Sequence, residues 1–202
     1  MNGDPRGHRG VSLVLALAAF VALPSLSVAQ DRGTPDGEWH FQSGDAWGTR
    51  YSPLTQIDAD NFENLEMQWV WRGDNFSPHP LYLSRSTPSY IDGLLYTVAG
   101  YRRTVAAMDP ATGETLWTYR EPNTKRWEES MRASYGKGVG YGEVDGRGII
   151  YVITPAFFLH ALDAKTGEHL EGFGNPVPIP GFPRTGVVDL LADLGHDYDP
   201  YE

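Results

Sequence analysis

The sequence contains no cysteine among its 202 residues. The folded chain is therefore held together by core packing, and it carries no Cys-x-x-Cys-His haem site, lipobox cysteine or vicinal disulfide within its length. Basic residues are also few, because 16 Lys and Arg stand against 26 Asp and Glu, for a formal net charge of −10. Such an acidic chain is a poor partner for nucleic acid or for an anionic membrane surface.

Long apolar runs are scarce as well. Residues 11–23 form one, and a run of that length is too short to span a bilayer. It follows two arginines and precedes a Ser-Val-Ala tripeptide ending at Ala29, whose small residues suit a cleavage site. We therefore predict a secretory signal peptide over residues 1–29, no membrane span in the remainder, and a periplasmic or secreted location.

Glycine and proline, by contrast, are plentiful, with 23 and 15 copies, which is typical of short strands joined by many turns. One stretch, residues 105–120, organises the rest because it occurs again at residues 159–174. Asp109 in the first copy recurs as Asp163 in the second, 54 positions later. Self-similarity with a period near 50 residues indicates propeller blades or another repeat array.

Each copy predicts a strand, a tight turn and a return strand. Residues 105–108 are apolar and include a branched side chain, as a strand inside a sheet should. The Asp-Pro-Ala-Thr-Gly sequence that follows supplies a side-chain acceptor, the fixed φ of proline and a glycine that tolerates positive φ, so the chain reverses there. Residues 115–119 return with Trp117 and Tyr119 on one face, because side chains alternate along a strand.

Upstream of each copy, an Asp-Gly pair separates two apolar runs, at Asp92-Gly93 and at Asp145-Gly146. Both pairs predict β-hairpins. Each hairpin, joined to the strand, turn and return strand that follow it, makes four strands. We therefore predict an all-β fold of small four-stranded antiparallel sheets, with a short lead-in strand at residues 38–41.

The outermost strands of these units are expected around Trp69, around Trp117 and at residues 169–173. The first two carry tryptophan at the same place, followed by Val-Trp-Arg or Thr-Tyr-Arg. The third has Glu171 where the pattern asks for tryptophan, so its packing should be weaker or taken over by Phe173.

The pattern Ala-x-Asp-x-x-Thr-Gly-x-x-x-Trp at residues 107–117 resembles the tryptophan-docking motif of the pyrroloquinoline quinone (PQQ) dependent dehydrogenases. Further matches, in the family's order, are Gly48-Thr49-Arg50-Tyr51-Ser52-Pro53-Leu54, Thr87-Pro88, Gly138-Val139, Ala161-Leu162-Asp163-Ala164-Lys165-Thr166-Gly167 and Gly186-Val187-Val188-Asp189-Leu190. The resemblance covers nearly all of the chain after the leader. It implies that residues 30–202 form a truncated, partial β-propeller, with about two four-stranded blades and a lead-in strand, of a family that is eight-bladed when complete.

The resemblance also implies a chemistry. Members of this quinoprotein family oxidise an alcohol or an aldose sugar with bound PQQ and calcium, and they pass the electrons to a cytochrome or ubiquinone. Their calcium ligands and catalytic aspartate come from later blades. We therefore predict no catalytic residue and no metal ligand in this chain, calcium ligands beyond residue 202, and no activity for the chain alone.

Three residues are predicted to bind PQQ on this resemblance. Lys137 stands where the family usually has an arginine that contacts the quinone, and lysine keeps the charge but loses the bidentate fork. Thr154 stands where a threonine hydrogen-bonds the cofactor, although such a residue also caps a turn. Arg85 replaces a glutamate that often contacts the cofactor, and it is either a partner for a quinone carboxylate or a solvated loop residue.

The sequence favours structural roles over ligand binding for two histidines and for one long loop. His160 and His169 flank a turn without metal-ligand spacing, and the sequence favours ordinary strand residues. Arg126, Trp127 and Arg132 lie in a long connection, residues 121–135, where a surface loop with a packed tryptophan is favoured over ligand binding. The alternative for the whole chain is a non-catalytic periplasmic β-propeller that serves as a scaffold or binding protein, since such propellers share the docking motif.

Overall fold

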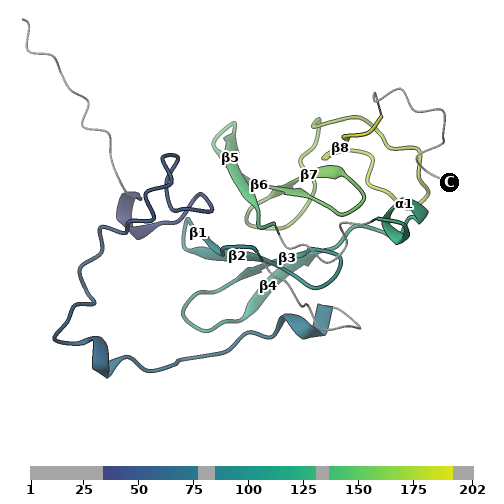
Figure 1. Cartoon of the computed structure of the whole chain (residues 1–202). Helices are drawn as coiled ribbons and strands as arrows, with labels where there is room; N and C mark the ends of the chain where they lie inside the picture. The colour runs from purple at the N-terminus through teal and green to yellow at the C-terminus, as the bar shows by residue number, and fades with distance from the viewer. Residues whose placement is uncertain (1–33, 77–84, 131–136, 193–202) are drawn as a thin grey trace, which may run out of the picture. The chain divides into compact units, whose positions relative to one another are not determined.

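The computed structural model describes residues 34–76, 85–130 and 137–192, so the predicted signal peptide lies outside the described residues. These ranges contain two four-stranded antiparallel sheets (Figure 1). The first sheet comprises β1 (Ser89–Ile91), β2 (Leu94–Ala99), β3 (Thr104–Met108) and β4 (Thr115–Tyr119), in that order. The second comprises β5 (Gly140–Val144), β6 (Arg147–Ile153), β7 (Phe158–Asp163) and β8 (Val187–Asp189). The helical turns are η1 (Pro35–Gly37), η2 (Phe62–Asn64), η3 (Gly73–Phe76) and α1 (Lys125–Glu128).

The two Asp-Gly hairpins form as predicted. Asp92 and Gly93 join β1 to β2 with φ of 47° and 77°, and Asp145 and Gly146 join β5 to β6 with φ of 51° and 73°. Two consecutive positive φ angles define the tight turn whose twist matches that of the flanking strands. Aspartate tolerates the left-handed region better than most residues, and glycine adopts it freely.

The repeated turn after β3 and after β7 is held by its aspartate. Asp109 Oδ1 accepts hydrogen bonds from the backbone N–H groups of Ala111 and Thr112, at 2.7 and 2.9 Å. These bonds hold the pKa of the Asp109 carboxyl below its usual range. Asp163 Oδ1 accepts from the two equivalent N–H groups, at 2.9 and 3.0 Å. The two copies of the sequence repeat therefore fold into the same local structure.

Tryptophan rings dock on these turns. The indole N–H of Trp69 donates to Pro110 O on the first turn, and that of Trp117 donates to Ala164 O on the second, both at 3.0 Å. The glycine at the end of each turn has a φ of 74°, and a Cβ there would lie 2.7 Å from the Trp69 ring or 2.6 Å from the Trp117 ring. The Thr-Gly pair thus supplies both the positive φ and the room for the ring.

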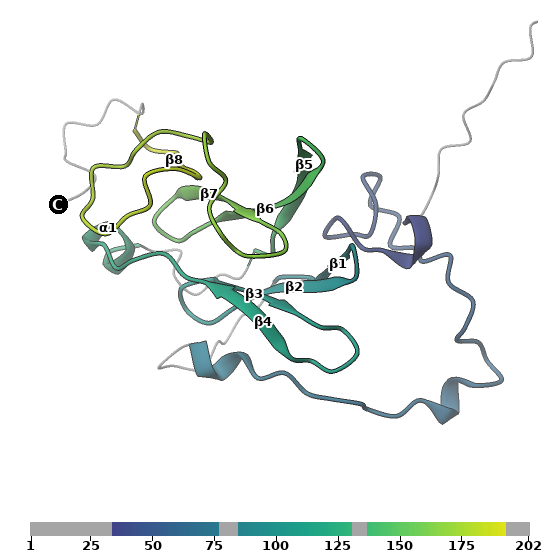
Figure 2. The same ribbon diagram turned by 180° about the vertical axis from the view of Figure 1, so that it is seen from behind.

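The main core lies between the two sheets, which adjoin each other in both views (Figures 1 and 2). Its buried members are Ile91, Tyr96, Val98, Val105, Ala107, Ile150, Val152, Leu162 and Ala164. The phenol of Tyr96, which is 1% exposed, donates to Ala164 O at 3.0 Å. Tyr96 and Trp117 therefore both bond the same carbonyl of the second sheet.

The predicted lead-in strand is short. Trp39 makes an antiparallel bridge with Tyr90 on β1, through backbone bonds of 2.7 and 3.2 Å. The segment around Trp69, expected as an outer strand, pairs with no other strand among the described residues, although its ring is docked. None of the helices in the described ranges has the length and apolar content that a membrane span requires.

The prediction of an outer strand at residues 169–173 is wrong. His169 makes a single bridge to Leu162, and the fourth strand of the second sheet is β8. The edge of β7 is therefore paired in two parts: Ala161 accepts from Leu170 N at 2.9 Å and donates to Gly186 O at 2.8 Å. Residues 171–186, which we call the excursion loop, leave the strand and return to it. Their Pro-rich sequence explains the departure, because proline cannot donate to a ladder.

Candidate functional site

The three residues predicted to bind a cofactor come from the same end of the two sheets. Arg85 precedes β1, Lys137 precedes β5, and Thr154 directly follows β6. Because β5 and β6 are antiparallel, with Gly140 opposite Tyr151, Lys137 and Thr154 belong to one end of the second sheet. The repeated turns lie at the other end. The fold thus gathers three separated segments at one end.

The segments before β1 and β5 approach closely. A Cβ added to Gly138 would lie 3.7 Å from both the Cβ of Ser86 and the carbonyl oxygen of Thr87. The neighbouring side chains of Arg85 and Lys137 are exposed. Two cations therefore extend from adjoining segments, in a chain whose net charge is −10.

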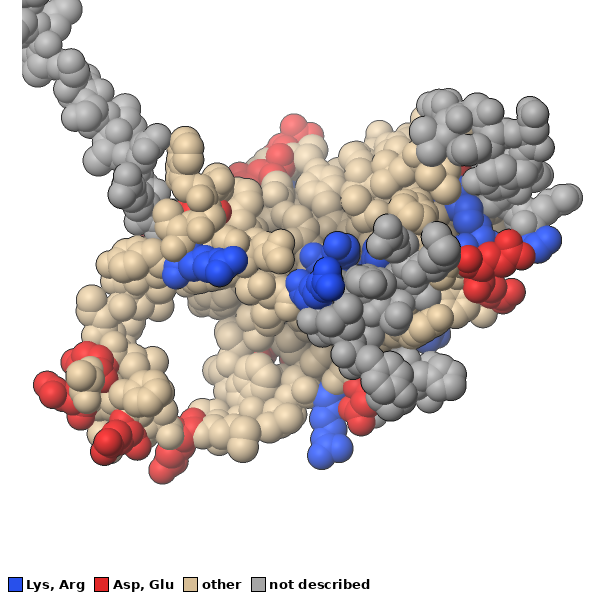
Figure 3. Space-filling view, in the orientation of Figure 1, with Lys and Arg blue, Asp and Glu red and all other residues tan. Residues whose placement is uncertain are grey.

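Acidic side chains gather elsewhere on the surface. Asp and Glu are concentrated over the loop that carries η2 on the face drawn in Figure 3. That loop contributes Asp58, Asp60, Glu63 and Glu66, while the nearest basic residues in sequence are Arg50 and Arg72. Lys and Arg side chains on the same face lie apart from this loop, and other Asp and Glu side chains lie beside some of them (Figure 3).

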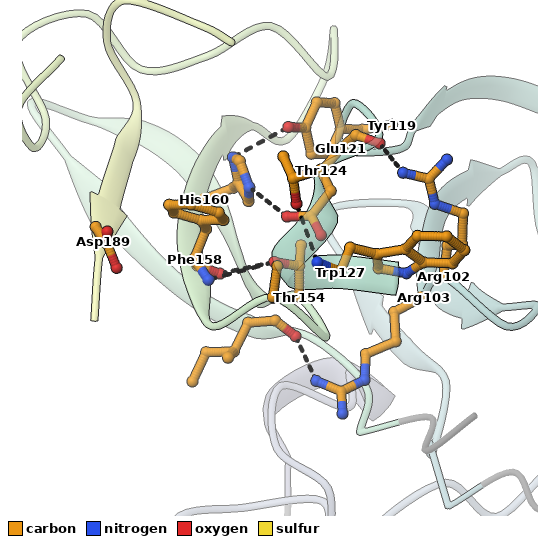
Figure 4. A network of polar contacts seen from close by, with 12 residues as sticks. Arg102, Arg103, Tyr119, Glu121, Thr124, Trp127, Thr154, Phe158, His160 and Asp189 are labelled. Carbon is orange, nitrogen blue, oxygen red and sulfur yellow. Dashed lines mark hydrogen bonds and ion pairs between the residues drawn. The ribbon is translucent and has the colours of Figure 1, made fainter. Parts of the chain in front are cut away.

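Thr154 is buried, with 2% of its surface exposed. Its hydroxyl donates to Phe158 O and accepts from Phe158 N, both at 3.3 Å, as the dashed line in Figure 4 indicates. The same carbonyl of Phe158 also accepts from Thr154 N at the shorter distance of 2.9 Å. Thr154 thus caps its own turn, which the sequence offered as an alternative to cofactor binding, and its hydroxyl proton makes the weaker of two bonds to one oxygen.

An arginine from the first sheet reaches this end of the second sheet. Arg103, in the turn between β2 and β3, is 6% exposed and donates to Ile153 O at 2.8 Å (Figure 4). It adopts a φ of 54°, which is unusual for a residue with a side chain. The bond ties the loops of both sheets together beside Thr154.

A buried polar network also joins the sheets. His160 on β7 is fully buried, and its Nδ1 lies 3.0 Å from the Tyr119 hydroxyl and 3.3 Å from His169 Nε2. Its Nε2 lies 3.5 Å from a carboxylate oxygen of Glu121, whose other oxygen is buried without a partner. Burial and the neighbouring His160 lower the pKa of His169 to about 4, so His169 is neutral at pH 7.

Sequence reasoning treated the two histidines as ordinary strand residues, and it missed that their rings contact each other and that His160 lies beside a buried carboxylate. The nine-residue separation across a turn was the available signal, because residues on antiparallel strands beside one turn lie close together. Within the ranges that the structure describes, no group of three or more His, Asp or Glu residues is arranged to hold a metal ion. The contacts of His160 with Tyr119 and Glu121 join the second sheet to β4 and to the segment that follows it.

The expected surface loop at Arg126 and Trp127 is instead a packed element. Arg126 forms a bidentate ion pair with Asp189 of β8, at 2.7 and 3.0 Å, and the two side chains are 8% and 6% exposed. Trp127 packs against the apolar cluster around Phe158, and the guanidinium of Arg102 lies 4.3 Å from its ring centroid. The prediction of a packed tryptophan is confirmed, the prediction that Arg126 is a surface-loop residue is wrong, and Arg132 lies outside the described residues.

The opposite end of the sheets has a cleft of its own, with a volume of about 530 Å³. Its lining includes carboxylates and two cations: Glu38, Asp92, Glu143, Asp163, Arg147 and Lys165. Lys165 lies 3.5 Å from Asp92, and both side chains are more than two-thirds exposed. This end carries the hairpin turns and no residue predicted to bind PQQ.

Repeated four-stranded sheets, joined by tryptophan rings on Thr-Gly turns, define the chain as part of a tryptophan-docked β-propeller. The sequence model described as "PQQ: Glucose/ethanol/alcohol dehydrogenase, beta-propeller domain" matches residues 39–201. The chain therefore belongs to this family of PQQ-dependent dehydrogenases. The family resemblance and the all-β, partial-propeller fold predicted from the sequence are confirmed.

Curated relatives include alcohol and glucose dehydrogenases. The chain is 33% identical over 172 residues to the 1-butanol dehydrogenase (cytochrome c) of Thauera butanivorans, covering 82% of this chain and 24% of that protein. It is 33% identical over 190 residues to the quinohemoprotein alcohol dehydrogenase ADH IIB of Pseudomonas putida, with coverages of 91% and 26%. For the quinoprotein glucose dehydrogenase of Escherichia coli, the identity is 32% over 174 residues, with coverages of 79% and 20%.

The solved structure of a europium-containing methanol dehydrogenase matches 65% of this chain and 22% of that one, with a TM-score of 0.52 and 24% identity. This likeness supports the fold. The chain spans about a quarter of the length of the curated relatives that it matches.

Proposed function

We propose that this chain is the amino-terminal part of an exported, PQQ-dependent dehydrogenase that oxidises an alcohol or an aldose sugar and passes the electrons to a cytochrome or a quinone. The family membership supports an oxidoreductase of this kind. The observation that carries the proposal is the convergence of Arg85, Lys137 and Thr154 at one end of two adjoining sheets.

The residues present at this end fit the cofactor. PQQ is an acidic, planar quinone, so cations and hydrogen-bond donors are the groups that recognise it. Lys137 supplies a compact positive charge, and Arg85 supplies a planar fork that matches a carboxylate. Gly138, next to Lys137, lies beside the segment that follows Arg85, because a Cβ there would lie 3.7 Å from Ser86 and Thr87.

Thr154 also has a hydrogen-bond donor to offer. Phe158 O keeps its shorter bond from Thr154 N when the hydroxyl turns away, so no buried carbonyl is left without a partner. We propose that the hydroxyl proton turns toward an oxygen of the bound quinone. This rotation loses only the 3.3 Å bond from the hydroxyl to Phe158 O, an oxygen that also accepts from Thr154 N.

PQQ, when bound, supplies the redox chemistry by accepting a hydride equivalent from the alcohol carbon. The residues of this chain bind and orient it: Lys137 and Arg85 neutralise acidic groups, and Thr154 fixes an edge. We place the calcium ligands and the base that takes the hydroxyl proton outside the described residues, in keeping with the resemblance.

The proposal is tested by titrating the full-length natural apoprotein with PQQ. Replacing Lys137 by alanine should weaken PQQ binding by about 1.5–3 kcal/mol, the range for a hydrogen bond to a charged group. Thr154→Val should have a smaller effect, because a neutral hydroxyl is lost. Lys165→Ala, at the opposite end of the same sheet, is the matched control and should leave the affinity unchanged.

Unchanged PQQ affinity in both Lys137→Ala and Thr154→Val would overturn the site assignment. The dehydrogenase activity needs its own test, an assay with an artificial electron acceptor. It is rejected if protein with verified PQQ and calcium occupancy oxidises no member of a broad panel of alcohols and aldoses.

A non-catalytic propeller remains the second candidate, favoured by one observation. Thr154 is 2% exposed and fully engaged with its own turn, as a purely structural residue would be. The same titration separates the two candidates, because a scaffold or binding protein would show no saturable PQQ binding in its natural form.

A further inference from the structure

The turn that carries Thr154 is held by more partners than a surface connection needs. Residues 154–158 join β6 to β7, and the backbone carbonyl of every one of them accepts a hydrogen bond. The donors are Phe157 N to Thr154 O at 3.0 Å, Ser130 Oγ to Pro155 O at 2.6 Å, Arg126 Nε to Ala156 O at 2.5 Å, Leu190 N to Phe157 O at 3.1 Å and Thr154 N to Phe158 O at 2.9 Å. Three of these five donors come from outside the turn.

The backbone of the turn is also strained. Phe157 adopts a φ of 63°, in the left-handed region that a bulky L-residue rarely enters. Such conformations persist where the surroundings over-determine them, and they cluster at ligand sites. The side chains on either side of it, Ala156 and Phe158, are fully buried, so the turn has no room to relax by rotating outward.

Arg126 is the residue that links the turn to two other segments. Its Nε bonds Ala156 O, its two terminal nitrogens bond both oxygens of Asp189, and its guanidinium lies 4.0 Å from the centroid of the Phe158 ring. An ion pair this buried requires correct geometry to offset its desolvation. Lysine carries all its donors on one nitrogen, so it lacks the planar fork that spans both Asp189 oxygens while Nε bonds Ala156 O.

We propose that Arg126, paired with Asp189, is a positioning residue for cofactor binding: it fixes the turn at residues 154–158 and so sets the orientation in which Thr154 meets PQQ. This inference rests on the proposed function, because it concerns the same site. Arg126 itself bonds no ligand. Three of its five N–H donors, one on each guanidinium nitrogen, are used within the protein, and its side chain is 8% exposed.

The test is a double-mutant cycle between Arg126 and Thr154 in the full-length natural protein, with PQQ affinity as the readout. Arg126→Lys keeps the charge and should weaken PQQ binding about tenfold, because it loses the fork. If Arg126 acts through Thr154, the double variant with Thr154→Val should bind PQQ no more weakly than the weaker single variant. Lys165→Arg, on the exposed pair with Asp92, is the matched control and should change nothing.

Hydrogen exchange provides a second readout that does not depend on PQQ. The amides of Phe158 and Leu190 should exchange at least several-fold faster in Arg126→Lys, while the amide of Ala107 in the first sheet stays protected. Where Arg126→Lys fails to fold, Asp189→Asn, which keeps the side-chain volume, takes its place in both measurements.

The outcomes separate the two proposals. No PQQ binding by the natural protein, or unchanged affinity in both Lys137→Ala and Thr154→Val, rejects the proposed site. An effect of Lys137→Ala with none of Thr154→Val overturns the positioning role alone, because Arg126 is proposed to act through Thr154. An effect of Thr154→Val combined with unchanged affinity in Arg126→Lys, or with strictly additive losses in the double variant, overturns the positioning role. Unchanged exchange at Phe158 and Leu190 in Arg126→Lys overturns it as well, whether or not PQQ binds.

Discussion

The two sheets share one sequence motif and differ in their outermost strand. In the first sheet, β4 pairs with β3 along its length apart from one register shift beside Trp117, and it presents Trp117 to the turn of the second sheet. In the second sheet, Leu170 N donates to Ala161 O, and the chain then leaves the edge of β7 at Glu171. It returns at Gly186, whose carbonyl accepts from Ala161 N. A shared turn therefore does not guarantee a shared outer strand, and the residue at the tryptophan position marks where the two diverge.

The difference has a physical reason. A tryptophan in β4 is stabilised by a hydrogen bond and by the surface of the next turn, so the strand gains from continuing. Glu171 offers no apolar ring to bury, and Gly172 follows it with a φ of 79°. Phe173 packs against Tyr151 of its own sheet, with ring centroids 5.8 Å apart. The excursion loop instead buries Val177 and Phe182 against Phe158.

The largest loss of stability is expected when the docking tryptophan of the first sheet is removed. Trp117→Ala should lower the free energy of unfolding by about 3–4 kcal/mol, because a large aromatic side chain and its hydrogen bond are lost between the sheets. Leu116→Ala, at a neighbouring site that is 50% exposed, is the control and should cost under about 0.5 kcal/mol. Urea unfolding measures both, and equal losses would mean that docking does not hold the sheets together.

A second change tests the fit between ring and turn. Gly167→Ala places a Cβ 2.6 Å from the Trp117 ring at a φ of 74°, whereas Gly146→Ala meets nothing within 4 Å at a φ of 73°. Alanine is destabilised by the positive φ at both positions, so the difference between the two losses of stability measures the ring contact alone. We expect Gly167→Ala to cost about 2 kcal/mol more than Gly146→Ala, as overpacking does. Equal unfolding midpoints would contradict the docking role of this glycine.

A smaller effect is expected from His169, which makes a single bridge to Leu162 and whose ring centroid lies 4.9 Å from that of Tyr119 in the first sheet. Its pKa is lowered from 6.5 to about 4 by burial and by His160, so the unfolded chain binds the proton more readily. Stability should therefore fall as the pH drops from about 6.5 toward about 4. Because the ring is partly exposed, we expect about 1 kcal/mol from this residue.

Thermal unfolding between pH 7 and pH 4 measures this dependence, with His169→Gln as the test variant. The glutamine variant should lose less stability over that range than the natural chain. An identical pH profile in both would show that the titration of His169 does not contribute. His40, which pairs with Glu38 near the surface, provides the matched control through His40→Gln.

The smallest effect is expected from restoring the missing aromatic. Glu171→Trp recreates the motif, yet the chain turns away at Gly172, so the new ring should find no partner among the described residues. The free energy of unfolding should change by less than about 0.5 kcal/mol, as for most surface substitutions. A gain above about 1 kcal/mol would mean that the residue type alone decides whether the strand continues.

The strands of both sheets could be predicted because each rests on local signals. The Asp-Gly pairs and the Asp-x-x-Thr-Gly turns specify tight reversals through φ preferences and side-chain acceptors. The outer strand of the second sheet could not be predicted in the same way. That strand, β8, is separated from its pairing partner β7 by the excursion loop, and pairing across such a separation depends on tertiary contacts that local propensity does not encode.

The candidate site was predicted less completely. The resemblance supplied Arg85, Lys137 and Thr154, and the fold brings their segments to one end. Arg126 was interpreted as a loop residue because its partner, Asp189, is 63 positions away and nothing local indicates the pairing. The contact between His160 and His169 was easier to predict, because residues a short distance apart on either side of a tight turn lie close together in space.

The carbonyl of Ala164 accepts from the Tyr96 hydroxyl and from the Trp117 indole, both at 3.0 Å. A carbonyl oxygen has two lone pairs, and here side chains of the neighbouring sheet occupy both. Each bond draws electron density out of the C=O bond, so this amide should absorb infrared light at a lower frequency than its neighbours. A single ¹³C label at Ala164 would therefore make the junction between the two sheets visible as one band, which shifts upward when the sheets part.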